Sequence, residues 1–228
     1  MPVNISAYQS IQATLVDQGV TLIAVSKTKP KEELMELYAL GHRAFGENYV
    51  QELVDKEAAL PKDIQWHFIG HLQSNKVKYI APFVFMIHGV DSEKLLQEIN
   101  KQAIKQNRII DCLLQVHIAT EETKFGFDGP SLHELLLSGR MANYTHIRCR
   151  GLMGMASFSD DQALLRQEFS TLHAYFVKAQ QAFPDGSFDT LSMGMSGDYE
   201  IAIQEGSNMV RIGSLLFGAR NYPAPNNK

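Results

Sequence analysis

The chain has 228 residues, of which 45% are hydrophobic and 20% are charged, and its formal net charge at pH 7 is −4. This composition is typical of a soluble globular protein with a full-sized core. The slightly acidic balance excludes proteins that bind nucleic acid or an anionic membrane through a broadly basic surface. We therefore expect neither as a partner, and we expect any anionic ligand to be held by local geometry.

The N-terminal segment and the cysteines indicate the cellular compartment. Residues 1–8 (MPVNISAY) have neither the cationic start nor the apolar stretch of a secretory signal. No apolar run approaches the ~20 residues that span a bilayer. Cys112 and Cys149 each lie in an apolar segment, where a reduced and buried thiol is the common state. We therefore expect a cytoplasmic protein.

The predicted elements begin with a helix over residues 4–17, where apolar residues recur at helical spacing. We expect this helix to cap the base of the fold. Eight short runs rich in β-forming residues follow, and segments of helical period such as 31–40 and 92–106 separate them. The eight runs are 22–27, 44–48, 66–71, 85–90, 111–118, 147–154, 190–195 and 209–217.

The longest helical segment, 160–183, carries a single apolar face, which we interpret as core and not as a cofactor site. Strand–helix alternation predicts a parallel sheet. Eight repeats in this length favour closure into a barrel over an open sheet. We therefore expect an α/β fold, a single (β/α)8 TIM barrel over residues 1–218, with 219–228 as a C-terminal tail.

The first predicted strand ends in a lysine at the face where such barrels carry their active sites. Ile23, Val25 and Lys27 share one face by the two-residue period, so Lys27 is expected to point into the barrel at its rim. Apolar neighbours disfavour a charged ammonium there and leave an amine able to attack an aldehyde. A solvated lysine just past a strand explains the position equally well. Lys29 has the same parity but lies beside Pro30 in a turn, so it should be more exposed.

The last two predicted strands are followed by groups suited to a phosphate. Ser196 and Gly197 open a predicted helix and offer unpaired N–H groups with a hydroxyl. At Gly213 the backbone can approach a ligand closely because glycine has no side chain, and Ser214 adds another hydroxyl. The loops after strands 7 and 8 commonly bind phosphate in these barrels. One such segment is an ordinary helix cap, but two at the expected loops indicate an anion site.

A lysine that captures carbonyls, facing a phosphate cradle, suits a phosphorylated aldehyde. Pyridoxal 5'-phosphate (PLP) is the leading candidate, and a sugar phosphate fits the same two features.

Motifs along nearly the whole chain resemble the YggS/PROSC family, the pyridoxal phosphate homeostasis proteins, which is itself similar to the barrel domain of alanine racemase. Taken in order, these motifs are far more specific than any one alone. They are residues 24–30 (AVSKTKP), 45–52 (FGENYVQE), 66–76 (WHFIGHLQSNK), 151–153 (GLM), 189–198 (DTLSMGMSGD), 210–213 (VRIG) and 217–218 (FG).

The resemblance implies a barrel of the alanine racemase N-terminal type that binds PLP as a Schiff base on Lys27. It implies that Arg211 contacts the pyridine nitrogen and that Asn48 lines the pocket. The phosphate is implied to lie on Ser196, Gly197, Gly213 and Ser214.

We interpret the chain as a carrier that buffers or delivers PLP and not as an enzyme. An arginine on the pyridine nitrogen leaves that nitrogen unprotonated and the ring a poorer electron sink. A racemase also needs a second base, which alanine racemases take from a C-terminal β domain, and only about ten residues follow the last predicted strand.

We expect a monomer, with PLP-dependent apo-enzymes as candidate recipients. The alternatives are an amino-acid racemase or lyase with a weak base such as His71, and a cofactor-free aldolase of sugar phosphates.

His67 and His71 share a face if the strand period continues through both. No cysteine or carboxylate accompanies them on that strand, whereas zinc sites use three or four ligands. We expect no metal and interpret both as hydrogen-bonded polar residues.

Overall fold

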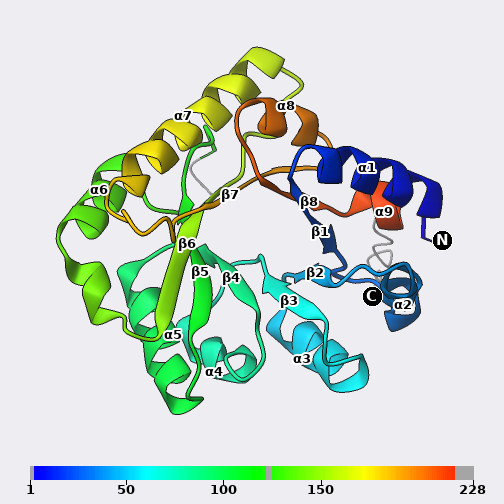
Figure 1. The fold of residues 1–228 in the computed structure, drawn as a ribbon, viewed down its shortest axis with the longest axis horizontal. Helices are drawn as coiled ribbons and strands as arrows, with labels where there is room; N and C mark the ends of the chain where they lie inside the picture. Colours follow the sequence, from blue (N-terminus) through cyan, green and yellow to red (C-terminus); the bar gives the residue numbers. More distant parts are fainter. Residues whose placement is uncertain (1–2, 122–124, 219–228) are drawn as a thin grey trace, which may run out of the picture.

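The computed structural model describes residues 3–121 and 125–218, which form a closed parallel barrel with helices outside it (Figure 1). The strands lie around the barrel in chain order, and β8 pairs with β1 to close it. The predicted fold class, a single (β/α)8 barrel, is confirmed, whereas the predicted tail 219–228 lies outside the described residues. The strands are β1 (Thr21–Val25), β2 (Ala44–Glu47), β3 (Gln65–Phe68), β4 (Met86–Val90), β5 (Ile110–Val116), β6 (Ile147–Gly154), β7 (Thr190–Met195) and β8 (Met209–Ile212).

Helices of very unequal length connect the strands. α5 and α7 are long and cover the outside of the sheet, whereas α4, α8 and α9 are short, and α8 and α9 follow the strands whose loops were predicted to bind phosphate. The helices are α1 (Ile5–Asp17), α2 (Lys31–Ala39), α3 (Val50–Ala59), α4 (Val77–Ile80), α5 (Glu93–Lys105), α6 (Gly129–Leu137), α7 (Gln162–Gln180), α8 (Tyr199–Gln204) and α9 (Ser214–Phe217), with 3₁₀ turns η1 (Ser74–Lys76) and η2 (Arg140–Asn143).

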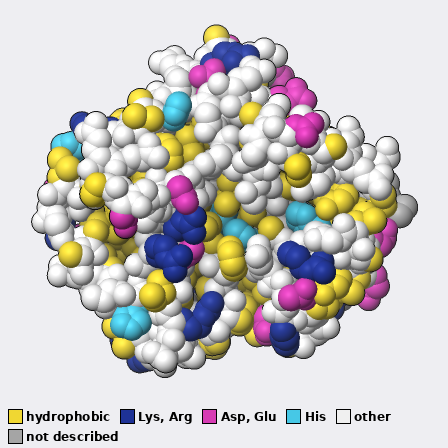
Figure 2. Space-filling model, viewed as in Figure 1, with side chains coloured by type: hydrophobic (Ala, Val, Ile, Leu, Met, Phe, Trp, Pro, Cys, Tyr) yellow, Lys and Arg dark blue, Asp and Glu magenta, His cyan; other side chains and the backbone are white. Residues whose placement is uncertain are grey.

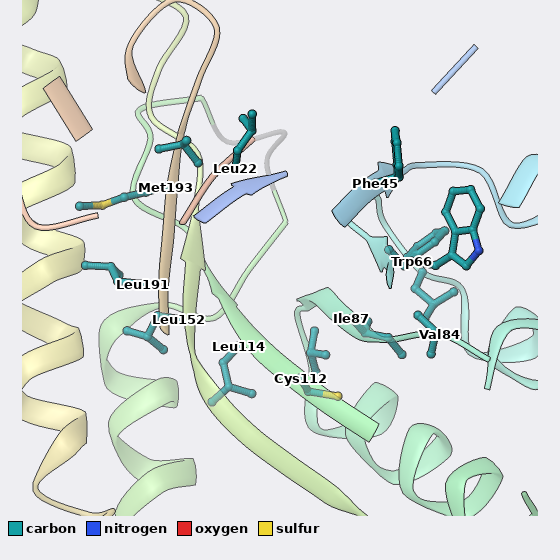
Figure 3. Close-up of a cluster of buried hydrophobic side chains, with 14 of the residues drawn as sticks. Leu22, Phe45, Trp66, Val84, Ile87, Cys112, Leu114, Leu152, Leu191 and Met193 are labelled. Atoms are coloured by element: carbon teal, nitrogen blue, oxygen red, sulfur yellow. The ribbon is translucent and has the colours of Figure 1, made fainter. Parts of the chain in front are cut away.

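Alternate residues of each strand face opposite sides of the sheet, as the strand period requires. The outward side chains pack against the helices in the main core (Figure 3). They include Leu22, Phe45, Trp66, Ile87, Cys112, Leu114, Leu152 and Leu191. The inward apolar side chains form a separate cluster within the barrel, namely Ile23, Met86, Leu113, Met153 and Met209.

Five strands end sooner than predicted at the carboxyl side of the barrel. β1 ends at Val25, β2 at Glu47, β3 at Phe68, β5 at Val116 and β8 at Ile212. The residues beyond these points were predicted to continue the strands because they are apolar or keep the right parity. They leave the sheet because the chain must turn there toward the next helix. Most candidate site residues therefore lie just past the ends of short strands, and Arg211 lies within β8.

The N-terminal helix lies in a different place from the one predicted. α1 packs on α9 and β1 in the outer ring of helices (Figure 1). The amide of Asn4 donates to the carbonyl of Leu216, beyond the carboxyl end of β8. The prediction that it caps the base was wrong, because the amphipathic pattern shows which face is buried and not what covers it. The four-residue α9 leaves the flank between β8 and β1 to α1, which buries Tyr8, Ile11 and Leu15 there.

The predicted apolar face of α7 is buried in the core, as its spacing indicated. Asp161 begins this helix by accepting from the amides of Ala163 and Leu164. Cys112 and Cys149 are free and buried, and burial raises the pKa of the Cys149 thiol to about 12. Neither thiol is therefore in its reactive, ionised form.

Two surface features bear on partners. No helix in the described ranges is long and apolar enough to cross a bilayer. Figure 2 shows acidic and basic side chains interspersed over one face of the molecule, without a broad patch of one sign.

Candidate functional site

A cavity of about 520 Å³ opens where the chain leaves the carboxyl ends of β1, β7 and β8. Its size lies within the roughly 300–1,000 Å³ of small-molecule sites. The carboxyl end is the face on which barrels of this kind carry their sites. All seven site residues predicted from the sequence line this one cavity: Lys27, Asn48, Ser196, Gly197, Arg211, Gly213 and Ser214.

Lys27 lies two residues past the end of β1, half-buried in the cavity wall. The inward position of Ile23 within the barrel agrees with the predicted parity. Thr28 follows with a φ of 63°, a left-handed conformation that is uncommon outside glycine. Lys29 also lines the cavity, but its Nζ donates to the carbonyl of Phe217 at 2.5 Å. Lys29 is therefore already bound to a main-chain carbonyl.

A buried ionic cluster lies behind Lys27, and the sequence reasoning did not find it. Nζ of Lys56 donates to Glu47 Oε1 and Glu52 Oε1, each at 2.7 Å, and the hydroxyl of Ser26 donates to Glu47 Oε1 at 2.6 Å. Burial raises the pKa of the Glu47 carboxyl, and the Lys56 ammonium opposes this rise. The four-residue spacing of Glu52 and Lys56 on α3 signals their pairing. Nothing in the sequence shows that Glu47 joins them.

Arg211 reaches the cavity from β8 and is itself buried within the barrel. Its Nη1 donates to the carbonyl and the hydroxyl of Ser192 at 2.9 and 2.6 Å, and its Nη2 donates to the carbonyl of Gly154 at 2.9 Å. Burial lowers the pKa of its guanidinium to about 10, so the group remains cationic at neutral pH. These bonds fix its orientation and use three of its five N–H groups.

Two neutral histidines continue from Arg211 through the barrel interior. Ser192 Oγ lies 3.3 Å from His88 Nδ1, and His88 Nε2 shares a hydrogen bond of 2.9 Å with His67 Nδ1. Burial lowers the pKa of His67 to about 3 and that of His88 well below its usual value. Both rings are therefore uncharged at neutral pH.

His71 does not share the surroundings of His67, so the predicted common face was wrong. β3 ends at Phe68, and the chain leaves the strand period before reaching residue 71. His71 Nδ1 lies 2.9 Å from Asp91 Oδ2, and its ring stacks on Phe125. It lines a second cavity, of about 420 Å³, and is absent from the described wall of the first.

The two predicted phosphate loops meet in the structure. The amide of Gly213 donates to Ser196 Oγ at 3.2 Å, which joins the segment after β7 to the segment after β8. A Cβ on Gly197 would meet nothing within 4 Å, whereas one on Gly213 would lie 3.2 Å from Val25. Ser196 and Gly197 were predicted to open a helix, but α8 begins at Tyr199 and they form the preceding turn. Because α8 and α9 are this short, these segments can offer an anion N–H groups and hydroxyls more than a helix dipole.

The remaining predicted residue, Asn48, leaves a polar atom unsatisfied. Its Oδ1 is buried and has no hydrogen-bond partner among the residues that the structure describes. Buried polar atoms are seldom left unpaired, so this atom is available to a group that enters the cavity. Asn48 lies in the wall of the 520 Å³ cavity. The residues present thus fit a phosphorylated, polar ring compound.

The fold and this cavity define a class of protein. A parallel eight-stranded barrel carries a lysine just past β1, and this lysine lines one cavity with the serines and glycines that follow β7 and β8. The family model for the alanine racemase N-terminal domain matches residues 6–221. Alanine racemase from Streptomyces coelicolor A3(2) is similar in fold, with a TM-score of 0.73 at 16% identity, over 96% of this chain and 60% of that chain.

Relatives of higher identity narrow this class to one family. The pyridoxal phosphate homeostasis protein of Pasteurella multocida is 42% identical over 214 residues, covering 92% of this chain and 91% of the relative. The Escherichia coli K12 protein of that name is 38% identical over 209 residues, covering 90% and 88%. PipY of Synechococcus elongatus PCC7942, solved with PLP bound, has a TM-score of 0.81 at 36% identity over 91% of this chain and 98% of that chain. The chain belongs to the pyridoxal phosphate homeostasis protein family, as its motifs indicated.

Proposed function

We propose that this protein binds PLP in the 520 Å³ cavity and serves cofactor homeostasis by holding PLP and releasing it to other proteins. One observation carries the proposal: Lys27 and the joined loops of Ser196 and Gly213 line the same cavity. The names of the curated relatives and the PLP-bound structure of PipY support it.

Each cavity residue has a proposed part in holding the cofactor. Lys27 would attach it covalently through Nζ, Arg211 would donate to the pyridine nitrogen, and Asn48 would line the ring. When bound, the group supplies an electrophilic aldehyde carbon and a conjugated ring that absorbs visible light. Its phosphate would lie on the hydroxyls and N–H groups of the cradle, namely Ser196, Gly197, Gly213 and Ser214.

Three features support a carrier without substantial catalysis of its own. Arg211, with a pKa of about 10, would donate a hydrogen bond and leave the pyridine nitrogen unprotonated, which limits carbanion chemistry. Lys29 and Asp198, which are also in the wall, are already bound to a main-chain carbonyl and a main-chain amide. His71, the base considered for a racemase or lyase, lines the other cavity.

The proposal extends to partners and compartment. We propose PLP-dependent apo-enzymes as recipients, with a cytoplasmic monomer in which residues 1–218 form one binding domain. The net charge of −4 and the interspersed surface charges of Figure 2 give no support to nucleic acid or membranes as partners. Buried, un-ionised thiols suit a reducing compartment.

Absorbance is the direct test of this function. Purified protein titrated with PLP is expected to gain a visible band that differs from free PLP and bleaches on borohydride reduction, with the added mass on Lys27. A sugar-phosphate aldolase would bind its substrate without any visible band. Isotope exchange at the α-carbon of a panel of amino acids tests the racemase and lyase alternative. Exchange above the rate given by free PLP would contradict the carrier proposal.

Filling the open space above Gly197 tests the phosphate cradle. Gly197→Leu is expected to weaken PLP binding by roughly tenfold or more, because the new side chain enters space that the phosphate needs. The fold should persist, since a Cβ at this position meets no neighbour. Fluorescence titration with PLP measures the affinity, and thermal unfolding without ligand checks the fold. Unchanged affinity in a folded variant would place the phosphate elsewhere.

A further inference from the structure

The ionic cluster behind Lys27 comprises Glu47 at the end of β2 and Glu52 and Lys56 on α3. Side-chain exposure is 0% for Glu47, 5% for Lys56 and 24% for Glu52. Both carboxylates share the single ammonium through their Oε1 atoms at 2.7 Å. Charges removed from water are costly, and an apolar replacement of a buried ion pair is often equally stable. Stability alone therefore gives little reason for a cluster of this kind.

The cluster binds the main chain on both sides of Lys27. Before it, the carbonyl of Ser26 accepts from Lys56 Nζ at 2.8 Å. After it, the amide of Thr28 donates to Glu52 Oε1 at 2.6 Å. Both peptide groups that flank Lys27 are thus held by one pair of side chains from α3.

The same contacts hold an unfavourable backbone conformation. Thr28 has a φ of 63°, which a β-branched residue adopts only when its surroundings impose it. The hydrogen bond from its amide to Glu52 supplies such a constraint. The turn that directs the chain away after Lys27 therefore depends on the cluster.

We propose that Glu47, Glu52 and Lys56 are positioning residues that aim the Lys27 amine at the aldehyde carbon of the cofactor. This inference rests on the proposed function and adds a separate role to it. The cradle and Arg211 capture the phosphate and the ring, whereas the cluster determines whether the captured molecule becomes attached. None of the three side chains is in the described wall of the 520 Å³ cavity, so their effect passes through the main chain of residues 26–28.

Two ligands separate attachment from capture. PLP carries the aldehyde, whereas pyridoxine 5'-phosphate has an alcohol at the same carbon and cannot attach. Glu52→Ala removes the acceptor of the Thr28 amide and is expected to weaken PLP binding by roughly tenfold or more, as small displacements of a reacting group do. Binding of pyridoxine 5'-phosphate should change little. A purely structural role would weaken both ligands equally.

The same helix offers a matched control. Glu57 is 22% exposed, close to the 24% of Glu52, and also pairs with a lysine, Lys62, at 2.7 Å. Glu57→Ala is expected to change neither affinity. Glu52→Gln keeps an oxygen that can accept from Thr28 and is expected to restore most of the PLP affinity.

The outcomes distinguish the two proposals. If the wild-type protein shows no visible band with PLP, the proposed function fails and this inference fails with it. If the wild type shows the band but Glu52→Ala leaves the ratio of the two affinities unchanged, the inference alone is overturned. Should Glu52→Ala not fold, Ser26→Ala removes one hydroxyl from the cluster. It is expected to lower the affinity for PLP relative to the affinity for pyridoxine 5'-phosphate.

Discussion

Replacing Lys27 with alanine is expected to abolish covalent attachment of PLP and the visible band completely. The amine at this position is the proposed attachment point, and the other lysine in the cavity wall, Lys29, is bound to the carbonyl of Phe217. The barrel should remain folded, because Lys27 lies past the end of β1 and is only half-buried. Absorbance before and after borohydride reduction, with mass spectrometry of the reduced protein, measures the attachment.

Lys29→Ala is the matched control for Lys27→Ala. It removes an amine of the same type from the same cavity wall, yet the visible band should survive. If Lys29→Ala abolishes the band and Lys27→Ala does not, the parity argument that selected Lys27 is wrong. If Lys27→Ala binds pyridoxine 5'-phosphate with nearly the affinity of the wild type, the cradle still captures the phosphate.

Residue parity predicted the place of Lys27. A two-residue period and the carboxyl-end rule put Lys27 at the barrel mouth, whereas Arg211 was implied by the family resemblance, and both line the cavity. Parity works for Lys27 because it lies only two residues past the end of β1. It failed for His71, because β3 had already ended at Phe68.

Contacts between elements distant in sequence were beyond the reach of sequence reasoning. Glu52 and Lys56 are neighbours on α3, but Glu47 and Ser26 reach them only after β1 and β2 pair. Likewise, the amphipathic pattern of α1 showed a buried face without showing that α9 and β1 cover it. Periodicity describes one element at a time, whereas these arrangements depend on how several elements pack.

The interior of the barrel explains why the site can combine rigidity with an open mouth. Ile23, Met86 and Met209 belong to an apolar cluster within the barrel. Arg211 is held by Ser192 and Gly154, so its guanidinium is oriented before any ligand arrives. A preoriented donor loses little conformational freedom on binding, which favours binding of the cofactor.

The barrel is expected to lose about 2 kcal/mol of stability between pH 7 and pH 5 through His67, and His88 adds to this loss. Burial lowers the pKa of His67 to about 3 and that of His88 well below its usual 6.5. Below pH 6.5 the unfolded chain binds protons at both rings, whereas the folded protein does not. The stability that depends on the two neutral rings is therefore present above pH 6.5 and falls as the pH decreases, by about 2 kcal/mol for His67 at pH 5.

Other buried groups contribute in both directions, so the measurement must isolate the pair. His42 is also buried with a lowered pKa and adds to the loss. Glu47 has a raised pKa and opposes it, because the folded protein binds its proton more readily than the unfolded chain does. Comparing variants with the wild type at each pH cancels these contributions.

His67→Gln is expected to reduce the loss between pH 7 and pH 5 by about 2 kcal/mol, the share of one ring. The amide can still pair with Nε2 of His88, so the variant should fold at neutral pH. Urea unfolding of the cofactor-free protein at both pH values measures the difference. His133, exposed on α6, supplies a control substitution of the same kind, His133→Gln. If His67→Gln loses as much stability as the wild type between pH 7 and pH 5, the ring at position 67 does not stay neutral inside the barrel. The hydrogen-bonded chain from Arg211 to His67 must then have a different protonation.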